Sequence, residues 1–249
     1  MRAPPKPHHA AVVVALLASA SAASVAPASA HEPISTAASI ALVEQIAKLN
    51  AVAGDTRAKE RAEAACDLGA KMAFVVQELN RELAQHGELG MGSQVLTKQL
   101  RALGVAVSFQ PEMKRYRAYL SPLEICVALA PESSKRNAAL FRLVRGRFYD
   151  SFLYDPLKPI GLTWRRLEAG IAAAERFLSS RPNPTEHEEA AFILAVDYIR
   201  ATRMAPDSMV ARSYAGKARV ALTEFVAAYP DSIRVGAAKV LLDVISADK

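Results

Sequence analysis

A histidine beside two glutamates, in residues 187–191, is the part of the chain that most suggests metal chemistry. The run His-Glu-Glu-Ala-Ala begins like the helical motif in which two histidines four residues apart bind zinc and a glutamate acts as base. Ala191 stands where the second histidine is required, so the motif fails. Thr185 and the glutamates behind it are instead typical of a helix start, where carboxylates stabilise the positive end of the helix dipole. We predict no metal site and no cofactor.

The other candidate sites each lack a necessary residue. Cleavage before His31 would leave an N-terminal amine and imidazole that can chelate copper, but nothing in the sequence brings a second histidine to that end. Gly87, Gly90 and Gly92 lack the lysine and the preceding strand of a phosphate-binding loop. Neither cysteine has a histidine nearby or a recognisable nucleophile motif. We therefore predict no catalytic residues and a function other than that of an enzyme.

Cys66 and Cys126 are the two cysteines of the chain, so only one pairing is possible. Both lie at apolar positions of predicted helices, and two interpretations stay open: a disulfide or two buried free thiols. Export to an oxidising compartment would favour the disulfide. In the chain-entropy model such a bridge would stabilise the fold by about 4 kcal/mol.

Positive charge is concentrated in residues 98–147, in a chain whose formal net charge is +6. This segment holds ten lysines and arginines against three glutamates, a local excess of seven positive charges. Such a surface can bind acidic proteins or the headgroups of phospholipid or lipopolysaccharide, and a solvated helix face is the alternative. The arginines that we predict to contact a partner are Arg115, Arg117, Arg142, Arg145 and Arg147.

Aromatic residues lie in and beside the irregular stretch at residues 150–164, which contains two prolines and a glycine. Tyr149, Tyr154 and Trp164 either pack this stretch onto the helices or form an aromatic edge that, with the neighbouring arginines, binds an anionic or peptide partner. Packing is the commoner role of such side chains.

The first thirty residues predict export. Two basic residues give a positive start, residues 10–18 are a short apolar run, and Ala28-Ser29-Ala30 has the small residues of a signal-peptidase site. We expect cleavage before His31, and cleavage after Ala22 would also satisfy the small-residue rule. The apolar run is far shorter than the roughly 20 residues of a membrane span. We therefore expect a mature chain without a transmembrane segment, periplasmic or secreted, whose partner is not nucleic acid.

Apolar residues recur every three or four positions after residue 35, which predicts an all-α fold. Ser35 or Thr36 can cap a first helix, and Asp55 offers a second helix start. From there one helix of about 30 residues is expected to run to His86, with Gly87 as its left-handed cap.

The next elements are shorter. Residues 93–103 predict a short helix stopped by Gly104, and residues 105–109 alternate as an extended segment does. Because a single short strand is not stable by itself, we predict a lone extended piece and no sheet. Trp164 opens the following helix.

Three helix ends share a pattern around a proline, at Pro131, Pro182 and Pro230. Each proline follows a helix end and precedes a Glu, Asn or Asp that can cap the next helix. Alanine stands eight residues later, an apolar residue at ten and leucine at twelve. These residues are Ala139, Ala190 and Ala238; Phe141, Phe192 and Val240; and Leu143, Leu194 and Leu242. Because small alanines let two helices approach closely, the pattern predicts helical hairpins.

The sequence around two of these prolines resembles a known repeat. Residues 224–232, Glu-Phe-Val-Ala-Ala-Tyr-Pro-Asp-Ser, and residues 175–183 around Pro182 are similar to tetratricopeptide-like repeats of bacterial envelope proteins. The repeats in question are those of outer-membrane assembly lipoproteins and of the Tol-Pal coordinator family. The resemblance covers roughly residues 120–249. The three prolines are 51 and 48 residues apart, against about 34 for the ordinary repeat, so the resemblance implies an irregular array.

We expect three parts in the chain: a signal peptide at residues 1–30, an N-terminal helical region at 31–104 and tetratricopeptide-like repeats at 105–249. The resemblance implies helical hairpins stacked beside a groove, and a non-catalytic periplasmic scaffold that binds a protein or peptide partner in the cell envelope. Two alternatives stay open. One is an envelope hydrolase, or an accessory of one, with a site assembled from dispersed residues; the other is a helical carrier of lipid or a small molecule.

Overall fold

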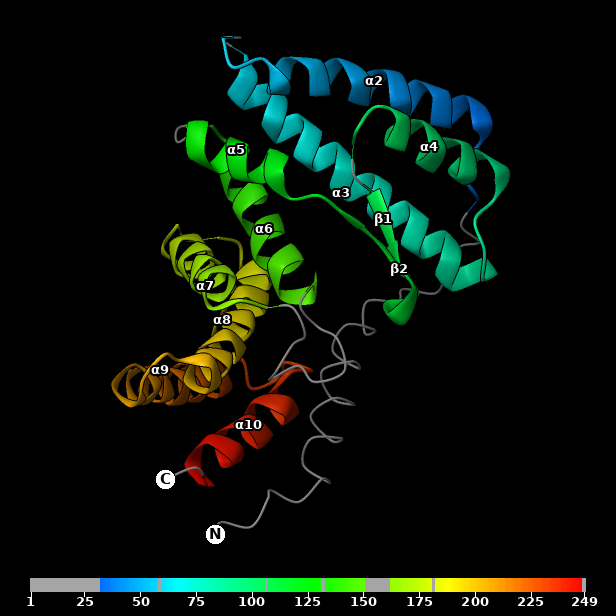
Figure 1. Ribbon diagram of the computed structural model, residues 1–249. Coiled ribbons are helices and arrows are strands. Elements are labelled where there is room, and N and C mark those ends of the chain that lie inside the picture. The colour runs from blue at the N-terminus through cyan, green and yellow to red at the C-terminus, as the bar shows by residue number, and fades with distance from the viewer. Residues whose placement is uncertain are drawn as a thin grey trace. The chain divides into compact units, whose positions relative to one another are not determined.

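The computed structural model describes residues 32–57, 60–105, 107–130, 133–150, 162–180 and 182–247 (Figure 1). The described chain is mostly helical, which confirms the predicted all-α class. It divides into two compact units, which we call the N-terminal unit (up to Leu143) and the C-terminal unit (from Val144). The predicted signal peptide and its cleavage point before His31 lie outside the described residues.

In its described residues, the N-terminal unit contains four helices, a hairpin of two strands and the start of a fifth helix. These elements are α2 (Thr36–Gly54), α3 (Arg61–His86), α4 (Met91–Ala102), β1 (Val107–Gln110), β2 (Arg115–Ala118), α5 (Ser121–Leu129) and α6 (Arg136–Asp150). The unit runs past residue 104, the predicted end of the N-terminal region, and the division from the C-terminal unit falls within α6. The C-terminal unit continues with α7 (Trp164–Ser179), α8 (Pro184–Met204), α9 (Ser208–Ala228) and α10 (Val235–Ala247).

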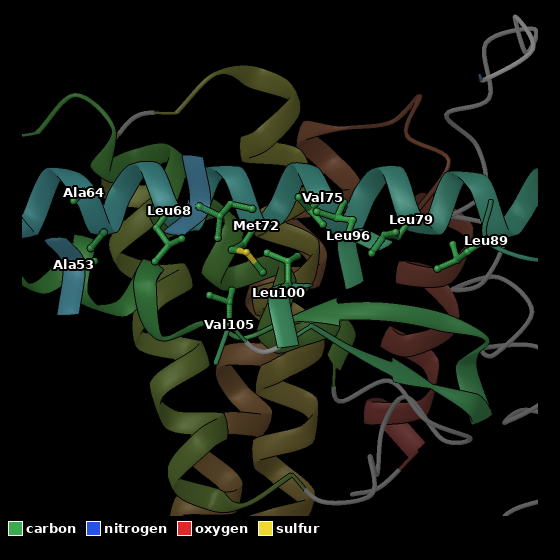
Figure 2. Packing of buried hydrophobic residues seen from close by; sticks show 12 residues of the cluster. Ala53, Ala64, Leu68, Met72, Val75, Leu79, Leu89, Leu96, Leu100 and Val105 are labelled. Carbon is green, nitrogen blue, oxygen red and sulfur yellow. The ribbon is translucent and has the colours of Figure 1, made fainter. Parts of the chain in front are cut away.

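Helix α3 is the centre of the N-terminal unit, and side chains of α2 and α4 pack against it in one apolar cluster. Figure 2 shows Leu68, Met72, Val75 and Leu79 of α3 in this cluster. The buried side chains of α3 recur at helical spacing, with Leu68, Met72, Val75 and Leu79 each no more than 2% exposed. They meet Leu96 and other residues of α4 and α2 in one apolar cluster. Burying each of these large side chains favours the fold by about 1.5–3 kcal/mol, so the α3 face is the main source of stability in this unit.

The helix ends follow the predicted capping residues with one exception. Ser35 caps α2, because its hydroxyl oxygen accepts a hydrogen bond of 3.2 Å from the Ala38 N–H, and Gly87 ends α3 in the left-handed conformation with φ +77°. Asp55 does not start a helix. Its N–H donates to carbonyl groups at the end of α2, and α3 begins only at Arg61. The predicted helix of about 30 residues therefore has 26.

The prediction of a lone extended piece is wrong, because β1 pairs with β2 in an antiparallel hairpin. The two strands are joined by a short 3-10 turn and by Lys114, which has φ +47°. Asn80 of α3 fixes the far side of β2: its side-chain oxygen accepts from the Tyr116 N–H at 2.6 Å, and its side-chain nitrogen donates to the Tyr116 carbonyl at 2.9 Å. The hairpin is stable because it pairs with itself and is held against α3.

A disulfide between Cys66 and Cys126 joins α3 to α5, and their Cα atoms are 4.7 Å apart. The sequence left open a disulfide or two buried free thiols, and the structure contains the disulfide. Both cysteines are buried in a small apolar cluster with Leu123 and Ala139. Gly69 lets α5 cross this closely, because a Cβ atom there would lie 2.3 Å from a methyl carbon of Leu123.

The C-terminal unit is a series of helices in which each packs against the next: α7 on α8, α8 on α9 and α9 on α10 (Figure 1). Helix α8 has neighbours on two sides, and every residue from 192 to 201 is buried. Ring contacts between α8 and α9 join His187 to Tyr229, Phe192 to Phe225 and Tyr198 to Tyr214. In these three contacts, the later the residue of α8 comes in the sequence, the earlier its partner comes. The two helices are therefore antiparallel.

The predicted proline turns separate α7 from α8 and α9 from α10. The start of α8 confirms the predicted cap after Pro182, which is Asn183, and Thr185 lies within the first turn of the helix. The Asn183 side-chain oxygen accepts from the Glu186 N–H at 2.9 Å, and Pro184 occupies the first helical turn. Pro131 lies outside the described residues. The alanines eight residues beyond each proline, Ala139, Ala190 and Ala238, are all buried.

Candidate functional site

Three aromatic residues from three helices of the C-terminal unit form a cluster that we call the aromatic cage. Trp164 is the first residue of α7, Tyr198 lies on α8 and Tyr214 lies on α9. The ring centroids of Trp164 and Tyr214 are 5.8 Å apart, and those of Tyr198 and Tyr214 are 5.9 Å apart. Tyr214 is therefore the central ring, with contacts to both other helices. Trp164 and Tyr214 are half-buried, so the cage is accessible from solvent.

Side-chain caps at two helix starts set the position of these rings. Thr163 caps α7, and its hydroxyl oxygen accepts from the Arg166 N–H at 3.3 Å, which fixes Trp164 in the first turn. Asp207 caps α9 by accepting from the N–H groups of Met209 and Val210 at 2.8 and 2.9 Å. Because these caps fix where each helix begins, they fix which side chains face α8.

A lysine and a glutamate complete the aromatic cage. The Lys217 Nζ lies 5.4 Å from the Tyr198 ring centroid and 5.3 Å from that of Tyr214, within the range of a cation–π contact. The same nitrogen is 3.7 Å from Oε1 of Glu175 on α7. The Tyr198 hydroxyl donates a hydrogen bond of 2.7 Å to that carboxylate oxygen. One cation is thus held by two aromatic rings and one carboxylate.

The electrostatics of the cage keep both tyrosines neutral. Burial raises the pKa of Tyr198, and the hydrogen bond to Glu175 and its negative charge raise it further. Burial also raises the pKa of Tyr214, with added effects of the Glu168 and Glu175 carboxylates. The phenols therefore act as hydrogen-bond donors and as π faces at physiological pH. The arrangement can recognise positive charge, and it contains the features of a cation-binding site.

A second polar cluster joins the start of α8 to α6 and to the turn before α10. The Arg145 Nε lies 2.7 Å from a Glu189 oxygen. The Arg234 Nη1 lies 3.0 Å from a Glu188 oxygen, to which the Ser232 hydroxyl also donates at 2.7 Å. Each carboxylate is thus paired with a guanidinium from another element, an arrangement that connects the helices.

The predicted site residues fall in different places. Arg115 and Arg117 lie on β2, and with Arg142 on α6 they belong to the N-terminal unit, whereas Arg145 and Arg147 belong to the C-terminal unit. Arg145 is paired with Glu189, and the Arg147 side chain donates to the Ala169 carbonyl at 2.8 Å. The segment that is continuous in sequence is therefore divided between two compact units, and two of its arginines already have partners within the fold.

The predicted aromatic residues are also divided. Tyr149 packs edge-on against Phe148, and its hydroxyl donates to Glu189 at 3.3 Å. Burial and the Glu189 charge raise the pKa of Tyr149. Trp164 belongs to the aromatic cage, and Tyr154 lies outside the described residues.

Sequence reasoning found Trp164 but missed its partners Tyr198, Tyr214, Lys217 and Glu175. The spacing of Tyr214 and Lys217, three residues apart on a predicted helix, places them on one face and was the available signal. Tyr198 is distant in the sequence, and its approach depends on how α8 packs against α9.

Other surfaces offer less chemistry. An open groove of about 660 Å³ between α2 and α3 is lined by Gln45, Lys48, Leu49, Asp67, Ala70, Lys71 and Phe74. The Lys71 Nζ donates to Gln45 Oε1 at 2.7 Å across it, and Phe74 is 48% exposed. Within the described ranges, no His, Cys, Asp or Glu side chains gather in threes as a metal ion requires. None of the helices that the structure describes is both long and apolar enough to cross a membrane.

Comparison of the chain with models of known protein families, with curated proteins and with solved structures gives no match.

Proposed function

We propose that the protein is an exported, non-catalytic scaffold of the cell envelope that binds a protein partner on its helical C-terminal unit. The observation that carries the proposal is the aromatic cage, in which the buried ring of Tyr198, the half-buried rings of Trp164 and Tyr214 and two partly exposed charges converge from three helices. Aromatic residues with a polar rim are typical of protein-binding surfaces. Each helix from α7 to α10 packs against the next, which supports the tetratricopeptide-like interpretation. Arrays of this kind bind extended segments along their helices.

The disulfide supports the proposed compartment. Bridges such as Cys66–Cys126 persist in oxidising environments and are rare in the reducing cytosol. Together with the leader-like first thirty residues, it favours a periplasmic site of action, with secretion as the alternative.

Glu188 and Glu189 connect α8 to neighbouring elements, as expected of a helical scaffold. Here each of the two carboxylates lies against a guanidinium, Glu188 against Arg234 and Glu189 against Arg145. These contacts hold the helices in place.

The basic segment remains a second proposed contact surface. Arg142 is half-buried on α6 and forms no ion pair with another described side chain. It is therefore the member of the predicted set best placed to meet an acidic partner. Reversal of its charge tests that surface separately from the cage.

A capture experiment tests the proposed function. The purified exported chain would be used to capture proteins from envelope extract, beside a Trp164→Ala/Tyr214→Ala variant, an Arg142→Glu variant and a Tyr119→Ala control. Tyr119 is 62% exposed in the N-terminal unit, so its removal matches the loss of an aromatic side chain elsewhere. We expect mass spectrometry to identify a protein that the control keeps and the cage variant loses.

The partner found in this way would be purified and its affinity measured with each variant by calorimetry. Loss of affinity with Trp164→Ala/Tyr214→Ala assigns binding to the cage, and loss with Arg142→Glu alone assigns it to the basic segment. A partner list that is the same for every variant, or no partner at all, would contradict the proposed function. Thermal unfolding of each variant would confirm that the comparison is made between folded proteins.

A further inference from the structure

We propose that the aromatic cage binds a lysine or arginine side chain from an extended basic segment of the partner, and that Lys217 occupies the same position when no partner is bound. The proposal rests on the proposed function and names the chemistry of the partner. It commits to a polypeptide with positive charges at a defined spacing.

The geometry of the cage suits a cation. The rings of Tyr198 and Tyr214 both face the Lys217 Nζ, and Glu175 supplies the negative charge. The hydrogen bond from the Tyr198 hydroxyl, 2.7 Å long, holds the Glu175 carboxylate at the cage when the cation changes. A site with fixed rings and a fixed carboxylate is preorganised, so little ordering is needed on binding.

Lys217 is held loosely enough to be displaced. Its side chain is 50% exposed, and its nitrogen lies 3.7 Å from the Glu175 oxygen, beyond hydrogen-bond distance. Exposed ion pairs of this kind contribute little to stability, because water screens the charges and the flexible side chains lose entropy. A lysine whose side chain is half exposed over two rings can move into solvent when another cation approaches.

Two exposed carboxylates of α7 act on the cage. Glu168 and Glu175 lie seven residues apart on this helix, and both raise the pKa of Tyr214. The same helix also carries Arg165, Arg166 and Arg176, so the attraction for a cation is local to the two carboxylates. Lys217 is the one cation described in contact with the Tyr214 ring.

The spacing of Glu168 and Glu175 indicates an extended segment. Seven residues are two helical turns, a rise of about 10 Å. In a polyproline II segment, side chains three residues apart share a face and are separated by about 9 Å. A segment with the pattern Lys-x-x-Lys can therefore place one charge at the cage and one at Glu168. A single quaternary ammonium ion can occupy only one of these positions.

Trp164 allows the proposal to be tested directly, because it is the only tryptophan in the chain. The full exported chain would be titrated with the capped peptide Gly-Lys-Pro-Pro-Lys-Gly while its tryptophan fluorescence is recorded. We expect a saturable change that weakens as salt is added. The peptide Gly-Glu-Pro-Pro-Glu-Gly should give no saturable change.

Two substitutions should change the affinity in opposite directions. Glu175→Gln keeps a hydrogen-bond acceptor for Tyr198 but removes the charge, and it should weaken peptide binding by about tenfold. Lys217→Ala empties the cage, and it should strengthen binding by about threefold, because the competing internal cation is gone. Glu224→Gln and Lys239→Ala remove the same charges from other exposed positions and should bind as the wild type does.

Three results with the variants and with choline would each overturn the proposal, and the capture experiment adds a further test. One is wild-type affinity in Glu175→Gln, and another is a Lys217→Ala variant that binds no more tightly. The third is choline binding as tightly as the peptide, which would assign the cage to a small quaternary ammonium ligand. If a captured protein keeps its affinity in the Trp164→Ala/Tyr214→Ala variant while the peptide fails to bind, this inference fails and the scaffold function stands. If the capture experiment finds no partner although the peptide binds, the proposed function fails and the cation site stands.

Discussion

Each of the two units of this protein is stabilised by different interactions. The N-terminal unit surrounds α3 with one apolar cluster and adds a covalent bond between Cys66 and Cys126. The C-terminal unit buries an ion pair in its central helix, where Arg200 is 1% exposed and its Nη1 lies 2.8 Å from Asp197 Oδ1. The Arg200 guanidinium also lies 4.4 Å from the Phe148 ring centroid. The N-terminal unit thus adds a cross-link to its apolar core, whereas the C-terminal unit adds a buried ion pair. The N-terminal unit also buries a charged group, because Glu82 of α3 is fully buried and accepts from the Gly90 N–H and the Ser93 hydroxyl.

The helix starts show the same difference. In the C-terminal unit Thr163, Asn183 and Asp207 each cap a helix through their side chains. In the N-terminal unit Ser35 caps α2, but α3, α4 and α5 start without such a hydrogen bond. Side-chain caps fix where a helix begins and so fix which residues face its neighbours. The unit that carries the aromatic cage is therefore the one whose helices are most closely specified.

The largest expected effect concerns the buried ion pair. Asp197→Ala leaves the buried guanidinium of Arg200 without this carboxylate, and it should lower the free energy of unfolding by about 3–5 kcal/mol. Urea denaturation followed by circular dichroism measures the change. Glu224→Ala on exposed α9 is the control and should stay within about 0.5 kcal/mol of wild type. A loss below about 1 kcal/mol for Asp197→Ala would remove the distinction between the two units.

Removal of the disulfide should have a slightly smaller effect, and a local one. Cys66 and Cys126 are 60 residues apart in the sequence. For a loop of this length the chain-entropy model gives a stabilisation of about 4 kcal/mol, which native strain tends to reduce. A Cys66→Ala/Cys126→Ala variant should show faster amide hydrogen exchange in α3 and α5, with α8 little changed. Equally faster hydrogen exchange in α8 would show that the disulfide stabilises both units alike.

Loss of a helix cap should cost less again. Asp207→Ala removes an acceptor for two backbone N–H groups at the start of α9. It should lower the free energy of unfolding by about 1 kcal/mol and reduce the affinity of the aromatic cage for the lysine peptide, because Tyr214 shifts. Ser35→Ala at α2 should cost a similar amount of stability and leave peptide affinity unchanged. Unchanged affinity in both variants would mean that the cap does not position the ring.

The smallest effect is expected at alkaline pH. The pKa values of Tyr198 and Tyr214 are raised in the folded protein, whereas tyrosine in the unfolded chain loses its proton near pH 10. Above that pH the unfolded state binds fewer protons than the folded state, so stability falls as pH rises toward the folded pKa values. Tyr198→Phe and Tyr214→Phe should each make the alkaline decrease less steep. Unfolding midpoints of each variant measured between neutral pH and pH 11 would show this smaller decrease. A decrease as steep as that of the wild type would contradict the raised pKa values of these tyrosines.

Much of the fold could be predicted because its signals are local. Ser35 and Gly87 act on neighbouring backbone groups, so a cap can be inferred from a few residues of sequence. The second strand could not be predicted in this way. Arg115 to Ala118 alternates arginine with an apolar residue over only four positions, and its extended conformation depends on pairing with β1 and on Asn80, more than thirty residues earlier in the sequence.

The candidate site was harder to predict because it depends on packing between helices. The cluster of arginines in residues 98–147 is a property of the linear sequence, and the fold divides it between two units. Arg145 is drawn into an ion pair by Glu189, which lies 44 residues away in the sequence. Tyr198 and Tyr214 meet because α8 and α9 are antiparallel, and no short-range pattern contains that information.

The contact between Asn80 and Tyr116 also affects how this protein behaves at high concentration. A strand whose outer N–H and C=O groups are unpaired is a template on which another chain can add a strand and begin an aggregate. At Tyr116 the amide of Asn80 takes both groups, as the backbone of a third strand would. One side chain thus occupies the N–H and C=O groups of Tyr116, so a further strand cannot pair with β2 at this residue.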